Sequence, residues 1–180
     1  MLARVTINRA PVLTLWGAVV AARMGYDWEE ALTLGKAVAG LNAQSKGRAL
    51  GIYGPPKGEE HPGEKPKKVG LGEEFWVKML GRSVPAKRTA QGVRAVVRDA
   101  PIDPQGVERY LRGKLKDDYD GVRAAMQKLA ASCSPKELAD AAYELYEAFR
   151  PRIPSGKQGW GAAGELDLDL IRSLAKRKDG

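Results

Sequence analysis

Residues 11–22 read PVLTLWGAVVAA, and this apolar stretch decides the fold of the chain. Its large side chains recur at the spacing of an α-helix: Val12, Leu15, Trp16, Val19 and Val20. The small residues Gly17, Ala18 and Ala21 lie on the other face, where they permit close contact with a second helix. We therefore expect a helix that is buried on most sides and that ends at Gly25, because glycine is favoured just past helix ends.

A second helix is expected directly after the first. Asp27 and Glu30 have the spacing of a capping box, in which each side chain accepts a hydrogen bond from the backbone N–H of the other residue. An apolar stripe follows: Ala31, Leu34, Val38 and Leu41. Gly40 weakens the helix, so the sequence leaves two options, one continuous helix or a turn at Gly40 with a separate short helix over residues 41–50. In both cases residues 1–53 form an N-terminal helical hairpin.

The chain changes character at residues 54–72. Proline, glycine and charged residues dominate this segment, so it can bury no core face. We expect a linker or loop here. It would separate the N-terminal hairpin from a mixed, mostly helical region over residues 73–180, although the two parts can also pack together as one domain.

The C-terminal region contains several sequence signals for the start of a helix. Asp103-Pro104 has the form of a cap followed by proline at the first helical position, and Ser134 begins a second capping box. Residues 75–80 fit either a strand or a helical turn, whereas residues 93–98 are rich in β-branched side chains. The predicted fold is therefore mainly α. It combines an N-terminal helical hairpin with a C-terminal helical bundle and has room for one small β-hairpin around residues 75–98.

The charge of the chain favours an anionic partner. Its 180 residues include 30 Lys and Arg against 22 Asp and Glu, for a net charge of +8. Cys133 is the only cysteine and His61 the only histidine, so we expect no disulfide, no metal site and no catalytic residue. We expect a cytoplasmic protein without cofactor or membrane span, and not an enzyme, although the sequence leaves enzymatic activity open. Residues 1–22 also have the proportions of an export signal.

Long segments carry Lys and Arg without any acidic residue, an arrangement that favours phosphate binding. The clearest are residues 75–98 and 31–58. Asn42 and Gln44 are of the types that read base edges, and residues 29–50 loosely resemble a helix-turn-helix unit. We therefore predict binding of DNA or RNA through a set of polar and basic residues: Asn42, Gln44, Lys46, Arg48, Arg82, Lys87, Arg88, Arg94 and Arg98.

Two alternatives stay open. The small-residue face of the first helix could pack against a partner chain, which would make the protein an interaction or oligomerisation module. The glycine loop at residues 155–164 could bind an anion or phosphate through Ser155 and Lys157, as a small binding domain or enzyme, with Cys133 as a candidate nucleophile. The loop matches a dinucleotide-binding fingerprint in letters only, because no strand precedes it and 16 residues follow Gly164.

Overall fold

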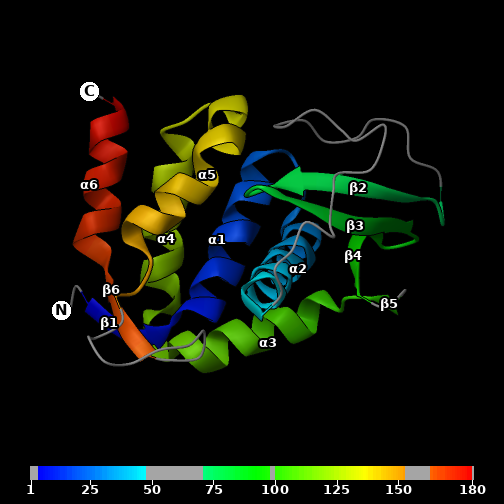
Figure 1. Cartoon of the computed structure of the whole chain (residues 1–180), viewed down its shortest axis with the longest axis horizontal. Helices are drawn as coiled ribbons and strands as arrows, with labels where there is room; N and C mark the ends of the chain where they lie inside the picture. Colours follow the sequence, from blue (N-terminus) through cyan, green and yellow to red (C-terminus); the bar gives the residue numbers. More distant parts are fainter. Residues whose placement is uncertain (1–3, 48–70, 98–99, 153–162, 180) are drawn as a thin grey trace.

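The structure is a computed structural model that describes residues 4–47, 71–97, 100–152 and 163–179 (Figure 1). Its helices are α1 (Arg9–Arg23), α2 (Trp28–Gly47), α3 (Pro104–Leu115), the short 3-10 helix η1 (Lys116–Asp118), α4 (Tyr119–Ala131), α5 (Pro135–Phe149) and α6 (Leu168–Asp179). Its strands are β1 (Arg4–Asn8), β2 (Glu74–Met79), β3 (Arg82–Thr89), β4 (Gly92–Val97), β5 (Ala100–Pro101) and β6 (Ala163–Asp167).

The fold is mixed α/β, so the prediction of a mainly α protein is wrong. Two antiparallel sheets are present in the described part of the chain, one with the order β1-β6 and one with the order β2-β3-β4-β5. In place of a single hairpin around residues 75–98, three strands form a meander that β5 extends. Strands β1 and β6 pair across almost the whole chain, and such a distant pairing leaves no local pattern in the sequence.

Helices α1 and α2 form the centre of the molecule, between the four-stranded sheet and helices α4, α5 and α6 (Figure 1). Every residue of α1 from Pro11 to Ala21 is buried, as predicted. The two helices cross at Gly17 and Gly35, where a Cβ atom added to Gly17 would lie 2.8 Å from Cα of Gly35. Only glycine permits this approach, so the small-residue face of α1 packs within its own chain.

Local signals at the helix ends are confirmed. Gly25 follows α1 with a φ of 117°, a conformation that favours glycine. Asp27 and Glu30 form the expected capping box, with hydrogen bonds of 2.8 and 3.0 Å. Ser134 closes a second box at α5, and Asp103 caps α3 ahead of Pro104.

Gly40 does not break helix α2, so the option of a turn there is wrong. The helix runs without interruption from Trp28 to Gly47. A glycine inside a helix costs about 1 kcal/mol relative to alanine, a penalty that a long, well-packed helix tolerates. The packing of α2 against α1, β3, β4 and α3 supplies that support.

Helix α2 also covers the part of strand β4 that the short strand β5 leaves unpaired. The carboxylate of Glu30 accepts a hydrogen bond from the backbone N–H of Val93 at 2.8 Å, and the hydroxyl of Thr33 accepts one from Ala95 at 3.0 Å. Both side chains are buried. Unpaired N–H groups at a sheet edge would otherwise be a desolvation cost and a site for aggregation.

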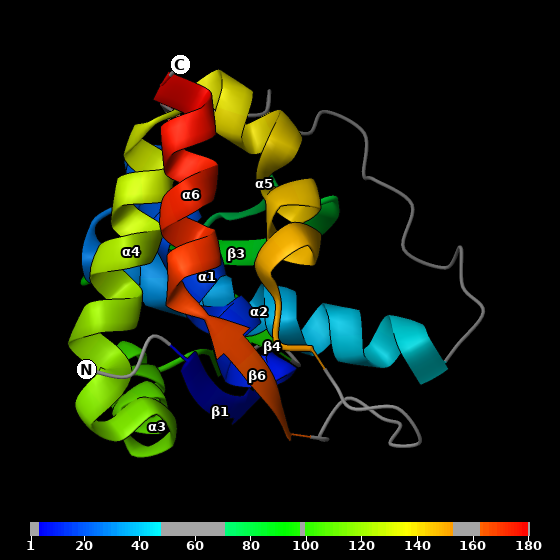
Figure 2. The same ribbon diagram turned by 90° about the vertical axis from the view of Figure 1, so that its left-hand side faces the viewer.

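The C-terminal helices close the other side of the core. Helix α6 packs against α4, and α4 packs against α1. The indole Nε1 of Trp16 donates to the carbonyl of Ala142 at 2.9 Å, which fixes α5 to the middle of α1. Figure 2 shows α4, α5 and α6 side by side, with the β1-β6 ribbon below them.

The predicted linker at residues 54–72 lies almost entirely outside the described residues, so the proposed division of the chain stays a prediction. Both sides of that segment contribute to one hydrophobic core. Among the helices that the structure describes, none has the length and apolar character needed to cross a membrane.

Candidate functional site

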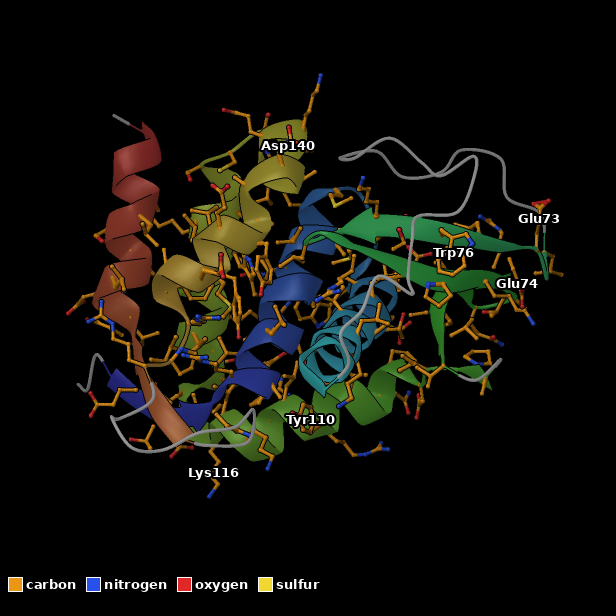
Figure 3. All side chains as sticks on the ribbon, viewed as in Figure 1. Glu73, Glu74, Trp76, Tyr110, Lys116 and Asp140 are labelled. Atoms are coloured by element: carbon orange, nitrogen blue, oxygen red, sulfur yellow. The ribbon has the colours of Figure 1, made fainter. Side chains whose placement is uncertain are left out.

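The outward face of the four-stranded sheet carries an exposed aromatic side chain between two lysines. Trp76, on strand β2, is 38% exposed and lies opposite Pro85 of β3 (Figure 3). Lys78 follows two residues later on the same face, because side chains of a strand alternate. Lys87 lies diagonally across on β3, about 7–8 Å from Trp76 between Cα atoms for such a pair. We call Trp76, Lys78, Pro85 and Lys87 the sheet platform.

The opposite face of the same sheet belongs to the core. Its buried side chains alternate with those of the platform: Val77, Val84, Ala86, Val93 and Ala95. These residues pack toward α2, which contacts both β3 and β4. This packing supports the sheet from behind the platform, and a supported surface suits binding.

The two lysines of the sheet platform have no acidic partner among the residues that the structure describes. Both are half-buried, and a lysine in this position lays its aliphatic stem on the protein while the ammonium group stays in water. Glu74 is an acidic residue on the same face, opposite Lys87. Figure 3 shows Glu73 and Glu74 at the far end of β2, beyond Trp76. The platform therefore joins one aromatic surface to two lysines, of which Lys87 has Glu74 as its cross-strand neighbour.

The structure brings only part of the predicted basic set together. Lys87 belongs to the sheet platform, whereas Arg82 and Arg88 have the opposite orientation along β3. Arg94 faces outward opposite Lys87 but is only 7% exposed. Its Nη1 donates to the carbonyl of Val93 at 2.9 Å, and its Nη2 lies 3.9 Å from Oε1 of Glu29. Arg94 therefore links the sheet to α2 and is not displayed on the surface.

The N-terminal part of the predicted interface is less well supported. Three residues of this predicted interface lie in the last turns of α2: Asn42, Gln44 and Lys46. Because α2 is one unbroken helix from Trp28 to Gly47, it lacks the turn near Gly40 that a helix-turn-helix unit would need. Arg48 and Arg98 lie outside the described residues.

Lys36, another cation of the acid-free segment, is occupied within the fold. Its ammonium group lies 4.1 Å from the centre of the Tyr110 ring, which Figure 3 shows on α3. Burial lowers the pKa of Lys36 and raises the pKa of Tyr110. This lysine therefore contributes to the α2–α3 contact and not to a surface for phosphates.

The glycine-loop alternative cannot be placed, because Ser155 and Lys157 lie outside the described residues. Cys133, the candidate nucleophile, is buried at 2% exposure. Its carbonyl accepts hydrogen bonds from the Arg23 guanidinium at 2.8 and 3.1 Å. The residue thus contributes to the junction between α1 and the end of α4.

The predicted interface did not include Trp76 or Lys78, although Lys78 lies in the acid-free segment 75–98. A signal was present, because Trp76 and Lys78 alternate with the apolar Val77 and Met79 at the period of a strand. Because residues 75–80 fit either a strand or a helical turn, the sequence alone does not assign these two side chains to a face of a sheet. The register of β2 against β3 places Trp76 and Lys78 on the same face of the sheet as Lys87.

A polar hollow lies between the start of α2, strand β4 and the start of α3, and no residue of the sheet platform is among those that line it. It has a volume of about 400 Å³ and is lined by Glu29, Gln91, Arg94, Asp103 and Gln105, among others. Amide and carboxylate groups of this kind can hydrogen-bond the edges of bases. Within the described ranges there is no group of three or more His, Cys, Asp or Glu side chains placed to hold a metal ion.

Comparison with known proteins identifies no relative: no family model, no curated protein and no solved structure matches this chain.

Proposed function

We propose that this protein binds single-stranded nucleic acid on the sheet platform. The observation that carries the proposal is the exposed Trp76 between Lys78 and Lys87 on one face of an antiparallel sheet. Proteins that bind single strands combine aromatic side chains, on which bases stack, with cations that contact the phosphates. Each component is present at a spacing that neighbouring nucleotides can span.

A single strand fits the platform better than a duplex does. Stacking on Trp76 requires an unpaired base whose face is free, and bases inside a duplex do not offer that face. The unbroken helix α2 also removes the helix-turn-helix arrangement that would have favoured major-groove binding. The net charge of +8 adds a long-range attraction for any polyanion.

The proposal is tested by fluorescence anisotropy with labelled single-stranded DNA, single-stranded RNA and duplex DNA at about 50 mM salt, where electrostatic binding is strong. We expect both single strands to bind more tightly than the duplex. A double substitution, Lys78→Gln with Lys87→Gln, should weaken binding, whereas Lys128→Gln, an exposed cation on α4, should not. Absence of binding to all three probes, or equal losses in both variants, would refute the proposal.

The alternative of an oligomerisation module depended on an available small-residue face of α1, and this face is buried. Gly17 and its small neighbours pack against α2 of the same chain and are buried. They are therefore not available to a partner copy. A single-strand-binding platform remains the function that the geometry supports best.

A further inference from the structure

Strand β2 forms one border of the four-stranded sheet, and Figure 1 shows it on the side opposite β5. Within the part of the chain that the structure describes, β2 pairs only with β3, so its outer edge has no strand beside it. An unpaired edge presents a row of backbone N–H and C=O groups that another strand can bind. The outer edge of β2 is therefore a candidate surface for a partner.

The hydrogen-bond pattern identifies the residues of β2 whose backbone groups face this outer edge. The turn to β3 has two residues, so Met79 and Arg82 on either side of it form a hydrogen-bonded pair. At the other end of the strand, the N–H of Arg88 donates to the carbonyl of Glu73 at 3.2 Å. Bonded and non-bonded pairs alternate along an antiparallel ladder, so the odd-numbered residues of β2 bond to β3. The groups at the outer edge therefore belong to the even-numbered residues: Glu74, Trp76 and Lys78.

The rest of the sheet is protected against pairing at its edges, whereas β2 is not. Glu30 and Thr33 of α2 accept hydrogen bonds from N–H groups of β4, and β5 is two residues long and contains Pro101. Covering helices, short strands and proline are common ways to block an edge. By contrast, β2 contains no proline, and its six residues pair with β3 without a bulge. Within the described ranges, no group from another element forms a hydrogen bond to its outer edge.

The charges of β2 suit pairing with a second copy of the same strand. Glu74 is exposed and Lys78 is half-buried, and they lie two residues before and two residues after Trp76 on the outward face. An antiparallel pair with a two-fold axis at Trp76 sets Glu74 of each copy directly opposite Lys78 of the other. Opposite charges in this position stabilise a strand pair. Glu74 also lies beside Lys87 of its own chain, so its carboxylate stands between two lysines in such a pair.

The same register satisfies the backbone groups of the edge. It makes Trp76 with Trp76, and Glu74 with Lys78, hydrogen-bonded pairs, so the outward N–H and C=O groups of all three residues find partners. On the core face, Phe75 lies opposite Val77 of the second copy. Phe75 is only partly buried within one chain, so the pairing covers it further. A shift by two residues in either direction separates Glu74 from Lys78, so the charges select this register.

We propose that this protein forms a two-fold symmetric dimer by antiparallel pairing of β2 with β2 of a second copy. The two four-stranded sheets then join into one, and the assembly closes at two copies, because β2 is used and β5 is too short to serve as a template. This surface differs from the buried small-residue face of α1. The pairing uses the backbone edge and leaves the outward face open, so it does not rest on nucleic-acid binding by the sheet platform.

Analytical ultracentrifugation measures the association, with the full chain freed of nucleic acid by nuclease and studied at about 1–100 μM. We expect an equilibrium between monomer and dimer. Glu74→Lys sets two lysines opposite each other at both ends of the paired strands, so it should raise the dissociation constant of the dimer about tenfold or more. Asp140→Lys is the matched control, because it makes the same change of charge at an exposed acid on α5, which Figure 3 shows away from Trp76. It should leave the dissociation constant unchanged.

An exchange of charges tests the register itself. Lys78→Glu should weaken the dimer as Glu74→Lys does, because it sets two carboxylates opposite each other. Mixing the two single variants, or combining both substitutions in one chain, restores opposite charges at both positions and should recover the association. A loss of folding in either single variant would not be repaired by mixing, so recovery in the mixture reports the contact between chains.

Amide hydrogen exchange followed by NMR supplies a second readout, which needs no variant. The N–H groups of Glu74, Trp76 and Lys78 should exchange more slowly as the protein concentration rises, whereas those of Phe75 and Val77 already bond to β3 and should change little. The proposal is overturned if the protein stays monomeric, assembles beyond a dimer, or associates equally well with Glu74→Lys. It is also overturned if the mixture of variants does not recover, or if the edge amides show no dependence on concentration.

Discussion

The carboxylate of Glu30 and the backbone N–H of Val93 form a hydrogen bond of 2.8 Å that joins the start of helix α2 to the edge of strand β4. The other oxygen of the same carboxylate accepts from the backbone N–H of Asp27 at 3.0 Å. Glu30 is 4% exposed, so both contacts are shielded from water. One side chain therefore caps a helix and protects a sheet edge at once.

Replacement of Glu30 should destabilise the protein strongly. Glu30→Ala removes two charge-assisted hydrogen bonds and leaves the N–H of Val93 buried without an acceptor. We expect a loss of about 2–4 kcal/mol in the free energy of unfolding. Urea denaturation measures it. The neighbouring Glu29 is 59% exposed along its side chain, so Glu29→Ala should cost less than about 1 kcal/mol. Equal losses in the two variants would contradict this role of Glu30.

Replacing either of two glycines of helix α2 by alanine should change the stability of the protein, but in opposite directions. A Cβ atom at Gly35 would lie 2.2 Å from the carbonyl oxygen of Thr14 and 2.6 Å from the backbone nitrogen of Ala18. Gly35→Ala must therefore push α1 and α2 apart, and we expect it to cost about 3 kcal/mol or more. Nothing lies within 4 Å of a Cβ atom at Gly40, so Gly40→Ala should stabilise the helix by up to about 1 kcal/mol. Thermal unfolding of both variants checks the pair, and a stable Gly35→Ala variant would show that the helices do not cross at glycine.

Ionisation of the Tyr119 phenol should lower the stability of the protein in alkaline solution. Burial and a 2.8 Å hydrogen bond from its hydroxyl to Glu108 raise the pKa of Tyr119 to about 12. The ordinary value of about 10 applies to the unfolded chain, so the protonated phenol favours the folded state. This contribution is complete below about pH 10 and is lost as the pH rises from about 10 to about 12.

Urea denaturation of wild type and Tyr119→Phe between pH 8 and 12 isolates this contribution. Other groups titrate in both proteins, so their effects cancel in the difference. The stability advantage of wild type should be constant at the lower pH values and should shrink above about pH 10. A difference that stays constant over the whole range would show that Tyr119 is not responsible.

Sequence reasoning predicted the features that depend on residues close together in the chain. The capping boxes at Asp27 and Ser134, the start of α3 at Pro104 and the burial of α1 all follow from the positions of a few side chains and were confirmed. The β-branched character of residues 93–98 also agrees with strand β4. These signals are local because caps and amphipathic periods are local.

Beyond the hairpin that the sequence allowed around residues 75–98, the sheets were missed for reasons that lie in their geometry. Strands β1 and β6 are five residues each, and Val5 pairs with Leu166, a residue far away in the sequence. Strand β5 consists of Ala100 and Pro101, and proline gives no strand signal.

The turn between β2 and β3 was equally hard to predict. It uses left-handed backbone at Leu80 and Gly81, with φ values of 49° and 74°. Leucine is not a residue type that signals such a turn. Since this turn sets the register of β2 against β3, the sheet platform could not be derived from the sequence.

Stacking and charge on the sheet platform should be separable. Trp76→Ala removes the stacking surface but no charge, so it should lower the affinity for single-stranded DNA about tenfold or more while the salt dependence stays the same. Lys87→Gln removes a phosphate contact, so it should lower the slope of log K against log salt by about 0.7. Anisotropy titrations between about 50 and 200 mM salt measure both quantities. Leu71→Ala is the control for Trp76, because Leu71 is also exposed, at 73%, but cannot stack on a base. If Leu71→Ala weakens binding as much as Trp76→Ala does, the contact is general hydrophobic association and not base stacking.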